Sequence, residues 1–150
     1  MDNQIINNDL SQCKQCVCFN LRKSSRAVTQ FYDEALHASG LRGTQFTLLA
    51  FLYNAGVTSI SLLSNALVMD RTTLSRNLKP LEKKKFITIK AGKDRRMKTI
   101  HLTKSGRNKL LKTFPLWQKA QSYIIQEIGQ ERWENILDDI SDVVSTTHSA

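Results

Sequence analysis

The sequence predicts a mainly α-helical fold with one small β-hairpin. Apolar residues recur at helical spacing over most of the chain, both before residue 85 and after residue 103. Between these parts lie two short runs rich in β-branched residues, joined by a polar connection that contains a glycine. The third observation is that residues 71–112, which include the hairpin, hold the excess positive charge of the chain.

Two helices are predicted first along the chain. The first spans residues 16–38, and Gly40 follows it where a left-handed C-terminal cap favours glycine. The second should span residues 44–54, with Thr44 as its N-cap and Gly56 near its end. The first segment has the apolar spacing of a helix.

A third helix over residues 61–67 and a fourth over residues 71–84 come next, and Asp70 offers an N-cap carboxylate to the fourth. Residues 86–90 and 99–103 are the two strands expected to pair as the hairpin. Three short helices followed by a β-hairpin define the winged helix-turn-helix architecture. We therefore expect a winged helix-turn-helix with a small β-hairpin wing.

The C-terminal part should form two long helices. Thr103 resembles an N-cap for the first, which reaches about Gly129 and should be kinked by Pro115. Its apolar face follows a 4-3-4-3-4 spacing through Leu110, Phe114, Trp117, Gln121, Ile124 and Ile128. The last helix carries Trp133, Ile136, Leu137, Ile140, Val143 and Val144 on one side. One chain of 150 residues can hardly bury both faces, so the pattern predicts a homodimer.

The length favours a single domain over residues 1–150. Within it we expect a DNA-reading part at about 44–103 and dimerisation helices at about 13–38 and 104–146. No secretory signal or membrane-length apolar stretch is apparent, which predicts a cytoplasmic protein with reduced cysteines. The sequence shows no Ser/His/Asp set, paired carboxylates or glycine-rich phosphate loop, so we expect neither an enzyme nor a cofactor.

Charge is distributed unevenly along the chain. Residues 71–112 hold fifteen Lys or Arg and two acids, a balance of +13, whereas the other residues hold seven and eleven, a balance of −4. A solvated basic face could account for such an excess, and a membrane surface could attract it. The basic block is not one amphipathic helix with an apolar insertion face, so its concentration in 42 residues favours nucleic acid as the partner.

The fourth helix carries the candidate DNA-reading side chains. Leu74, Leu78 and Leu81 share its inward face, which leaves small hydroxyl and basic residues outward. Such side chains donate to phosphates, and arginine can reach guanine N7 and O6 bidentately. A solvated polar face with a capping threonine is the alternative. The outward candidates are Arg71, Thr72, Thr73, Ser75, Arg76 and Lys79.

The hairpin connection is strongly basic, with Lys93, Arg95, Arg96 and Lys98 around a single acid, Asp94. Arginines on such a wing suit the narrow minor groove beside the recognition helix, where negative potential is enhanced. Asp94 is better placed to orient an arginine than to approach phosphate. The wing candidates for DNA contact are therefore Arg95, Arg96 and Lys98.

Four motifs together resemble the multiple-antibiotic-resistance-regulator family, MarR. They are residues 70–76 (DRTTLSR), 81–83 (LEK), 94–96 (DRR) and 102–106 (LTKSG), and the resemblance covers roughly residues 16–145. It implies an obligate homodimer, a double-stranded palindromic operator, and repression relieved by a small molecule or an oxidant. On the family pattern Thr72, Thr73, Ser75, Arg76, Lys79 and Arg96 are DNA contacts. Lys85 departs from the pattern because relatives usually have glycine before the hairpin, and a positive φ at that position would cost lysine about 1 kcal/mol.

Cys13, Cys16 and Cys18 lie at the entry to the first helix. They could be incidental thiols, a site for a soft metal ion without a completed tetrahedral zinc shell, or a redox switch. Cys18 and Tyr32 resemble the peroxide-sensing branch of the family, the organic hydroperoxide resistance regulators. The resemblance implies oxidation of Cys18 and its contact with tyrosine across a dimer. Gly43 falls where that branch has a second tyrosine, although Arg22 could lower the pKa of the Cys18 thiol.

The principal alternative function is a general architectural DNA-binding protein without a regulatory ligand. A small aromatic ligand could also act as effector in place of peroxide. A cysteine-based redox enzyme is a weaker alternative, because the Cys13-x-x-Cys16 pair lacks the βαβ context of such motifs.

Overall fold

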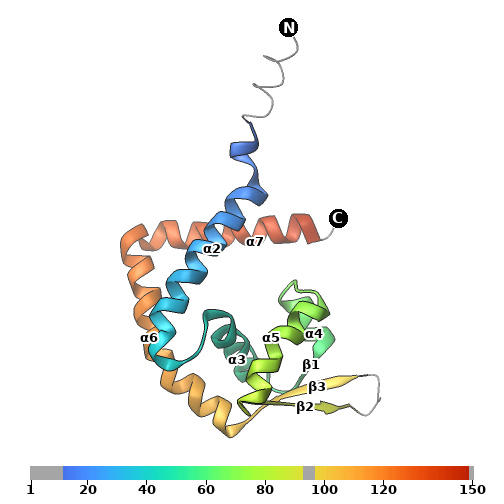
Figure 1. Cartoon of the computed structure of the whole chain (residues 1–150). Coiled ribbons are helices and arrows are strands. Elements are labelled where there is room, and N and C mark those ends of the chain that lie inside the picture. Colours follow the sequence, from blue (N-terminus) through green and yellow to red (C-terminus); the bar gives the residue numbers. More distant parts are fainter. Residues whose placement is uncertain (1–11, 93–96, 149–150) are drawn as a thin grey trace. The chain divides into compact units, whose positions relative to one another are not determined.

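The computed structural model describes residues 12–92 and 97–148 (Figure 1). Its elements follow the predicted order, with one short strand and two short 3-10 helices in addition. They are η1 (Gln12–Gln15), α2 (Val17–Leu36), η2 (His37–Ser39), α3 (Gly43–Ala55), β1 (Thr58–Ser59), α4 (Ile60–Ala66), α5 (Arg71–Lys83), β2 (Ile87–Ala91), β3 (Lys98–Leu102), α6 (Lys104–Ile128) and α7 (Gln130–His148). The chain divides into two compact units, one up to Thr113 and one from Phe114. The prediction of a mainly helical winged helix-turn-helix is confirmed.

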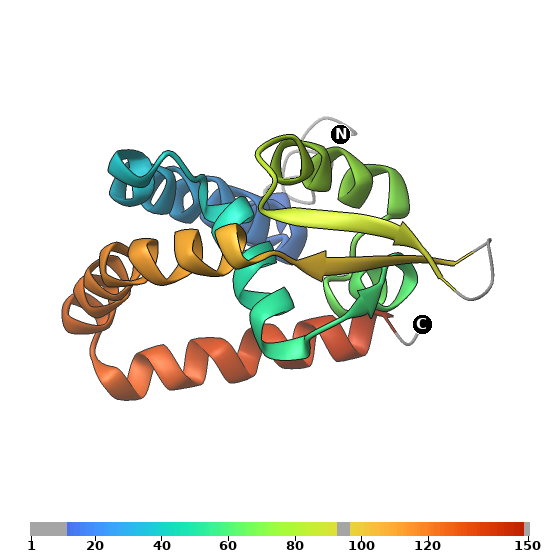
Figure 2. The same ribbon diagram turned by 90° about the horizontal axis from the view of Figure 1, so that it is seen from below.

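The sheet has three antiparallel strands in the order β1-β3-β2. The strands β2 and β3 run side by side as a narrow hairpin that extends away from the helices of its unit (Figure 2). Ala91 pairs with Lys98, so the ladder has the predicted length but lies one residue nearer the tip, and Lys98 lies on a strand instead of in the connection. The strand β1 was not predicted, because a two-residue strand has no alternation to detect.

The core of the first unit is built mainly from leucine. On α5, Leu74, Leu78 and Leu81 are completely buried, which confirms the predicted inward face. The sheet adds Ile87 and Ile100 to the same core. The other buried apolar residues of this unit are Leu36, Leu41, Phe46, Leu48, Leu49, Leu52, Leu63 and Leu110. This core fixes the outward direction of the remaining α5 side chains.

The helix α3 begins at Gly43, and the prediction that Thr44 is its N-cap is wrong. The carboxylate of Asp33 on α2 accepts the Gly43 N–H at 2.7 Å, so a side chain ten residues away satisfies this helix end. A Cβ atom at position 43 would lie 3.3 Å from the Tyr32 Cβ, which makes a small residue favourable there. The next helix, α4, also begins earlier than predicted, with Ser59 accepting the Leu62 N–H at 3.1 Å.

Two helices end in left-handed residues that are not glycine. Val68 after α4 has φ 48°, and Lys85 after α5 has φ 59°. Each lies in a Schellman turn, in which N–H groups after the helix bond back to its last carbonyls. In the second turn, Phe86 N–H donates to Leu81 O and Lys85 N–H donates to Glu82 O. Lys85 therefore has a positive φ, the conformation for which the family pattern has glycine at this position.

The wing joins α6 through a closely packed junction. The Thr103 hydroxyl accepts the Gly106 N–H at 3.0 Å, so the predicted N-cap is confirmed. Its proton faces Lys85 O at 2.8 Å and Phe86 O at 3.0 Å, and the Thr103 N–H donates to Phe86 O at 3.0 Å. A Cβ on Gly106 would lie 2.0 Å from Phe86 O. Only glycine allows the first turn of α6 to approach the hairpin this closely.

The second unit contains the C-terminal part of α6 and all of α7, joined at Gly129, which has φ 85°. The rings of Phe114 and Trp117 stack with centroids 5.6 Å apart. The helix assignment continues through Pro115, and a kink there stays a prediction. Within the described residues, none of the helices is both long enough and apolar enough to span a membrane.

Candidate nucleic-acid interface

The N-terminus of α5 is held by Asp70, as predicted. One carboxylate oxygen accepts the Thr73 N–H at 2.8 Å, and the other accepts the Thr73 hydroxyl at 2.6 Å. These hydrogen bonds, chiefly the one from the Thr73 hydroxyl, lower the pKa of Asp70 below its ordinary value of 3.8. The Thr73 hydroxyl proton is therefore engaged in the cap, and only its oxygen could accept a further hydrogen bond.

The outward face of α5 is exposed and carries both hydroxyl and basic groups. Thr72, Ser75, Arg76 and Lys79 are exposed, whereas Thr73 is partly buried. Arg71 is also exposed, and its guanidinium donates to the Ser61 hydroxyl of α4 at 3.0 Å. The helix that follows the turn at Val68 thus presents a polar face backed by three buried leucines.

Two adjoining hollows separate α5 from the hairpin. Ser75, Lys79 and Lys98 line the larger one, together with Ile60, Glu82, Ile89, Lys90 and Ala91. Arg71, Ser75 and Lys98 line the smaller one, together with Ser59, Ile60, Ser61 and Met97. Four predicted site residues, Arg71, Ser75, Lys79 and Lys98, are therefore brought together.

Some predicted DNA contacts do not line these hollows. Thr72 and Arg76 are exposed on α5 but line neither hollow, and Arg95 and Arg96 lie outside the described residues. Sequence reasoning missed Lys90, which lines the larger hollow from β2. Its alternation with Ile89 in a β-prone run was the available signal.

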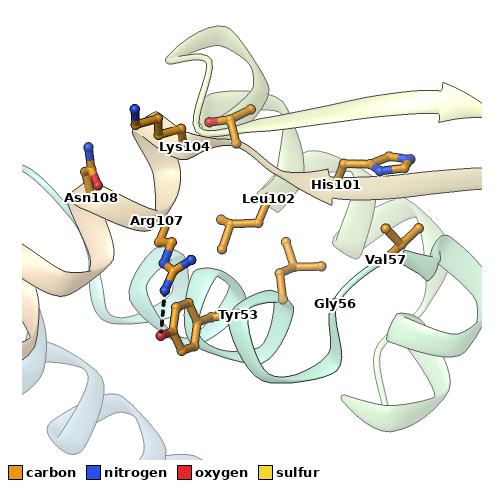
Figure 3. Close-up of a pocket in the computed structure, with 10 residues that line it drawn as sticks. Tyr53, Gly56, Val57, His101, Leu102, Lys104, Arg107 and Asn108 are labelled. Carbon is orange, nitrogen blue, oxygen red and sulfur yellow. Dashed lines mark hydrogen bonds between the residues drawn. The ribbon is translucent and has the colours of Figure 1, made fainter.

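A third hollow lies elsewhere on the first unit, between α3, the sheet and the start of α6 (Figure 3). The Arg107 side chain points to Tyr53, with its guanidinium carbon 5.2 Å from the ring centroid and Nη2 donating to the phenol oxygen at 3.5 Å. Leu52, Val57 and Leu102 provide apolar walls. An apolar hollow with a cation at its edge could accommodate a small anionic molecule with an apolar body.

The three cysteines are exposed free thiols. In the part of the chain that the structure describes, no three His, Cys, Asp or Glu side chains are arranged to hold a metal ion. Cys18 and Tyr32 both lie on α2, and partial burial raises the pKa of the Tyr32 phenol. A contact between Cys18 and tyrosine across a dimer stays a prediction.

Comparison with known proteins assigns the chain to a family. The model of the MarR family matches residues 39–97. The transcriptional regulator MosR of M. tuberculosis, solved in complex with DNA, is 34% identical with a TM-score of 0.82, over 89% of this chain and 97% of that one. The chain belongs to the MarR family.

Other relatives of this MarR-family regulator agree with the assignment. The HTH-type transcriptional regulator SarZ of Staphylococcus haemolyticus is 29% identical over 140 residues, covering 88% of this chain and 92% of SarZ. The S. aureus MepR–DNA complex, at 23% identity and a TM-score of 0.74, covers 87% of this chain and 98% of MepR and supports the fold alone. The resemblance seen in the motifs is therefore confirmed at the level of the family.

Proposed function

We propose that this MarR-family transcriptional regulator acts as a homodimer that binds a palindromic double-stranded DNA operator and represses transcription. The observation that carries the proposal is the convergence of Arg71, Ser75, Lys79 and Lys98 around the hollows between α5 and the hairpin. A helix with exposed hydroxyl and basic side chains beside a basic wing fits duplex DNA. The solved complex of MosR with DNA supports this partner.

The proposed dimer is supported by apolar side chains that remain exposed. On α2, Val17, Leu21 and Val28 share one face by helical spacing, and Val28 is 47% exposed. On α7, Ile136, Leu137, Ile140 and Val144 are similarly exposed. A two-fold dimer would place two recognition helices about 34 Å apart, one turn of DNA, which explains a palindromic operator.

Binding to a palindromic promoter fragment and to random duplex, at matched salt, tests the proposal. We expect tighter binding to the palindrome, and equal affinity would favour an architectural DNA-binding protein.

Arg76→Ala should cost about 1–3 kcal/mol of binding free energy and relax the sequence preference, if Arg76 contacts a base. Lys112→Ala on α6 removes one positive charge at an exposed position that lines neither hollow, and it serves as the control. Unchanged affinity of Arg76→Ala would remove that residue from the site.

The proposed repression is relieved by an effector, for which two candidates have specific support. The hollow at Arg107 and Tyr53 favours an aromatic anion, and the exposed thiols at 13, 16 and 18 favour oxidation. Gel-shift assays with benzoate or with an organic hydroperoxide distinguish the two. Arg107→Gln should abolish release by benzoate, and Cys18→Ser should abolish release by hydroperoxide. Release that persists in a variant would exclude that residue as the sensor.

A further inference from the structure

Residues 37–43 form the turn that connects α2 to α3, and both ends of this turn are held by side chains. At one end, the Ser39 hydroxyl donates to Leu36 O at 2.7 Å and accepts the Leu41 N–H at 3.1 Å. At the other end lies the hydrogen bond from Gly43 N–H to Asp33. Leu36 and Leu41 are buried, which anchors the turn in the core. We call residues 37–43 the α2–α3 turn.

Two lysines from distant parts of the chain donate to consecutive carbonyls of the α2–α3 turn. Lys109 Nζ on α6 donates to Ser39 O, and Lys84 Nζ at the end of α5 donates to Gly40 O at 3.1 Å. They are 70 and 44 residues away from their acceptors. Carbonyls at the end of a helical segment lack partners within the helix and carry partial negative charge, so both ammonium groups suit this position.

The backbone of Lys84 is itself fixed relative to α5. Lys84 is the C-cap residue of that helix, and its N–H donates to Pro80 O at 3.1 Å. The Schellman turn at Lys85 follows immediately. The hydrogen bond to Gly40 O therefore joins the α2–α3 turn to the end of the helix that carries the DNA-reading candidates.

We propose that Lys84 and Lys109 are positioning residues that fix the direction of α2 relative to α5, and thereby determine which half-site spacing the dimer accepts on DNA. The inference rests on the proposed function, in which α2 contributes to the dimer interface and α5 reads the duplex. Neither lysine needs to touch DNA, because each acts through the α2–α3 turn.

The length of α2 makes the spacing sensitive to this turn. A helix of 20 residues is about 30 Å long at a rise of 1.5 Å per residue. A change of about 6° at its C-terminal end would move the other end by about 3 Å, close to one base-pair step. Two lost hydrogen bonds at the turn could thus permit neighbouring half-site spacings that the intact turn excludes.

Selection from a random-sequence duplex library tests the inference, with the full chain and its variants selected in parallel. We expect the unmodified protein to enrich one half-site sequence at one dominant spacing. The double variant Lys84→Met/Lys109→Met keeps the apolar stems but loses both donors. It should enrich the same half-site, with the fraction of sequences at the dominant spacing reduced at least twofold in favour of spacings one base pair shorter or longer.

Lys83→Met and Lys112→Met are matched controls, because they remove exposed lysines from the same two helices without touching the turn. They should keep the dominant spacing, and Lys84→Arg/Lys109→Arg should restore it by retaining donors. If the double variant does not fold by circular dichroism, the single variants are selected instead. A folded variant that keeps one spacing, or that changes the half-site sequence itself, would overturn the inference. If the unmodified protein enriches no sequence, the proposed function fails as well.

Discussion

Left-handed backbone at single residues is a source of strain in this chain, and Lys85 is the clearest example. With φ 59° its Cβ approaches the adjacent carbonyl, a conformation that only glycine adopts without cost. We predict that Lys85→Gly raises the free energy of unfolding by about 0.5–1 kcal/mol, as measured by urea denaturation.

Lys85→Ala and Lys83→Gly provide the controls for this prediction. Alanine retains the Cβ, so Lys85→Ala should not stabilise the protein. Glycine within α5 should destabilise it by about 1 kcal/mol. If Lys85→Ala stabilises as much as Lys85→Gly, the gain comes from the lost lysine side chain and not from relieved backbone strain.

Asp70 gives a pH dependence whose sign follows from its hydrogen bonds. Its pKa is lower in the folded chain than its ordinary value of 3.8, so the folded state favours the charged form. The stabilisation is fully present above pH 3.8 and is lost as the pH falls through the lowered pKa.

The variant Asp70→Asn tests this dependence, because asparagine keeps an N-cap acceptor that does not titrate. Urea midpoints measured from pH 6 to pH 2.5 should fall more steeply for the unmodified chain than for Asp70→Asn. Parallel curves would show that Asp70 does not contribute to acid unfolding.

Among the elements, the hairpin and α6 depend on each other most directly. Thr103 and Gly106 join them at Phe86 O, and a Cβ at position 106 would lie 2.0 Å from that oxygen. We predict that Gly106→Ala lowers the free energy of unfolding by about 1–3 kcal/mol. Ser105→Ala, at an exposed neighbouring position, is the control and should change little. Equal stability of the two variants in thermal denaturation would show that α6 and the hairpin separate at Phe86 O without an energetic cost.

At the scale of the whole molecule, the proposed dimer predicts that a charge on one face of α2 weakens the dimer, whereas a charge on the opposite face does not. Val28→Asp places a charge on the exposed apolar face, whereas Gln30→Asp places the same charge on the opposite face. Burying an unpaired carboxylate in an interface is costly. We therefore expect Val28→Asp to weaken the dimer at least about tenfold in dissociation constant. Light scattering over a concentration series measures the change, and a similar effect of both variants would argue against this face.

The sequence by itself determined the order of the helices, the hairpin, the cap at Asp70 and the inward leucines of α5. These features depend on neighbours in sequence, since caps and amphipathic spacing act over three to seven residues. The same local motifs carried the resemblance to the MarR family, and the comparisons confirmed it. Local reasoning also identified Lys85 as a position where the backbone would matter.

The tertiary structure alone decided the features that join distant residues. Asp33 replaced Thr44 at the start of α3, the short strand β1 paired with β3, and Lys98 became part of the ladder. The hydrogen bonds from Lys109 to Ser39 O and from Lys84 to Gly40 O likewise join residues that are distant in sequence. No spacing rule relates such partners, because the folded backbone brings them together across 10 to 70 residues. Packing therefore determined how α5 is held, whereas the sequence determined which side chains that helix carries.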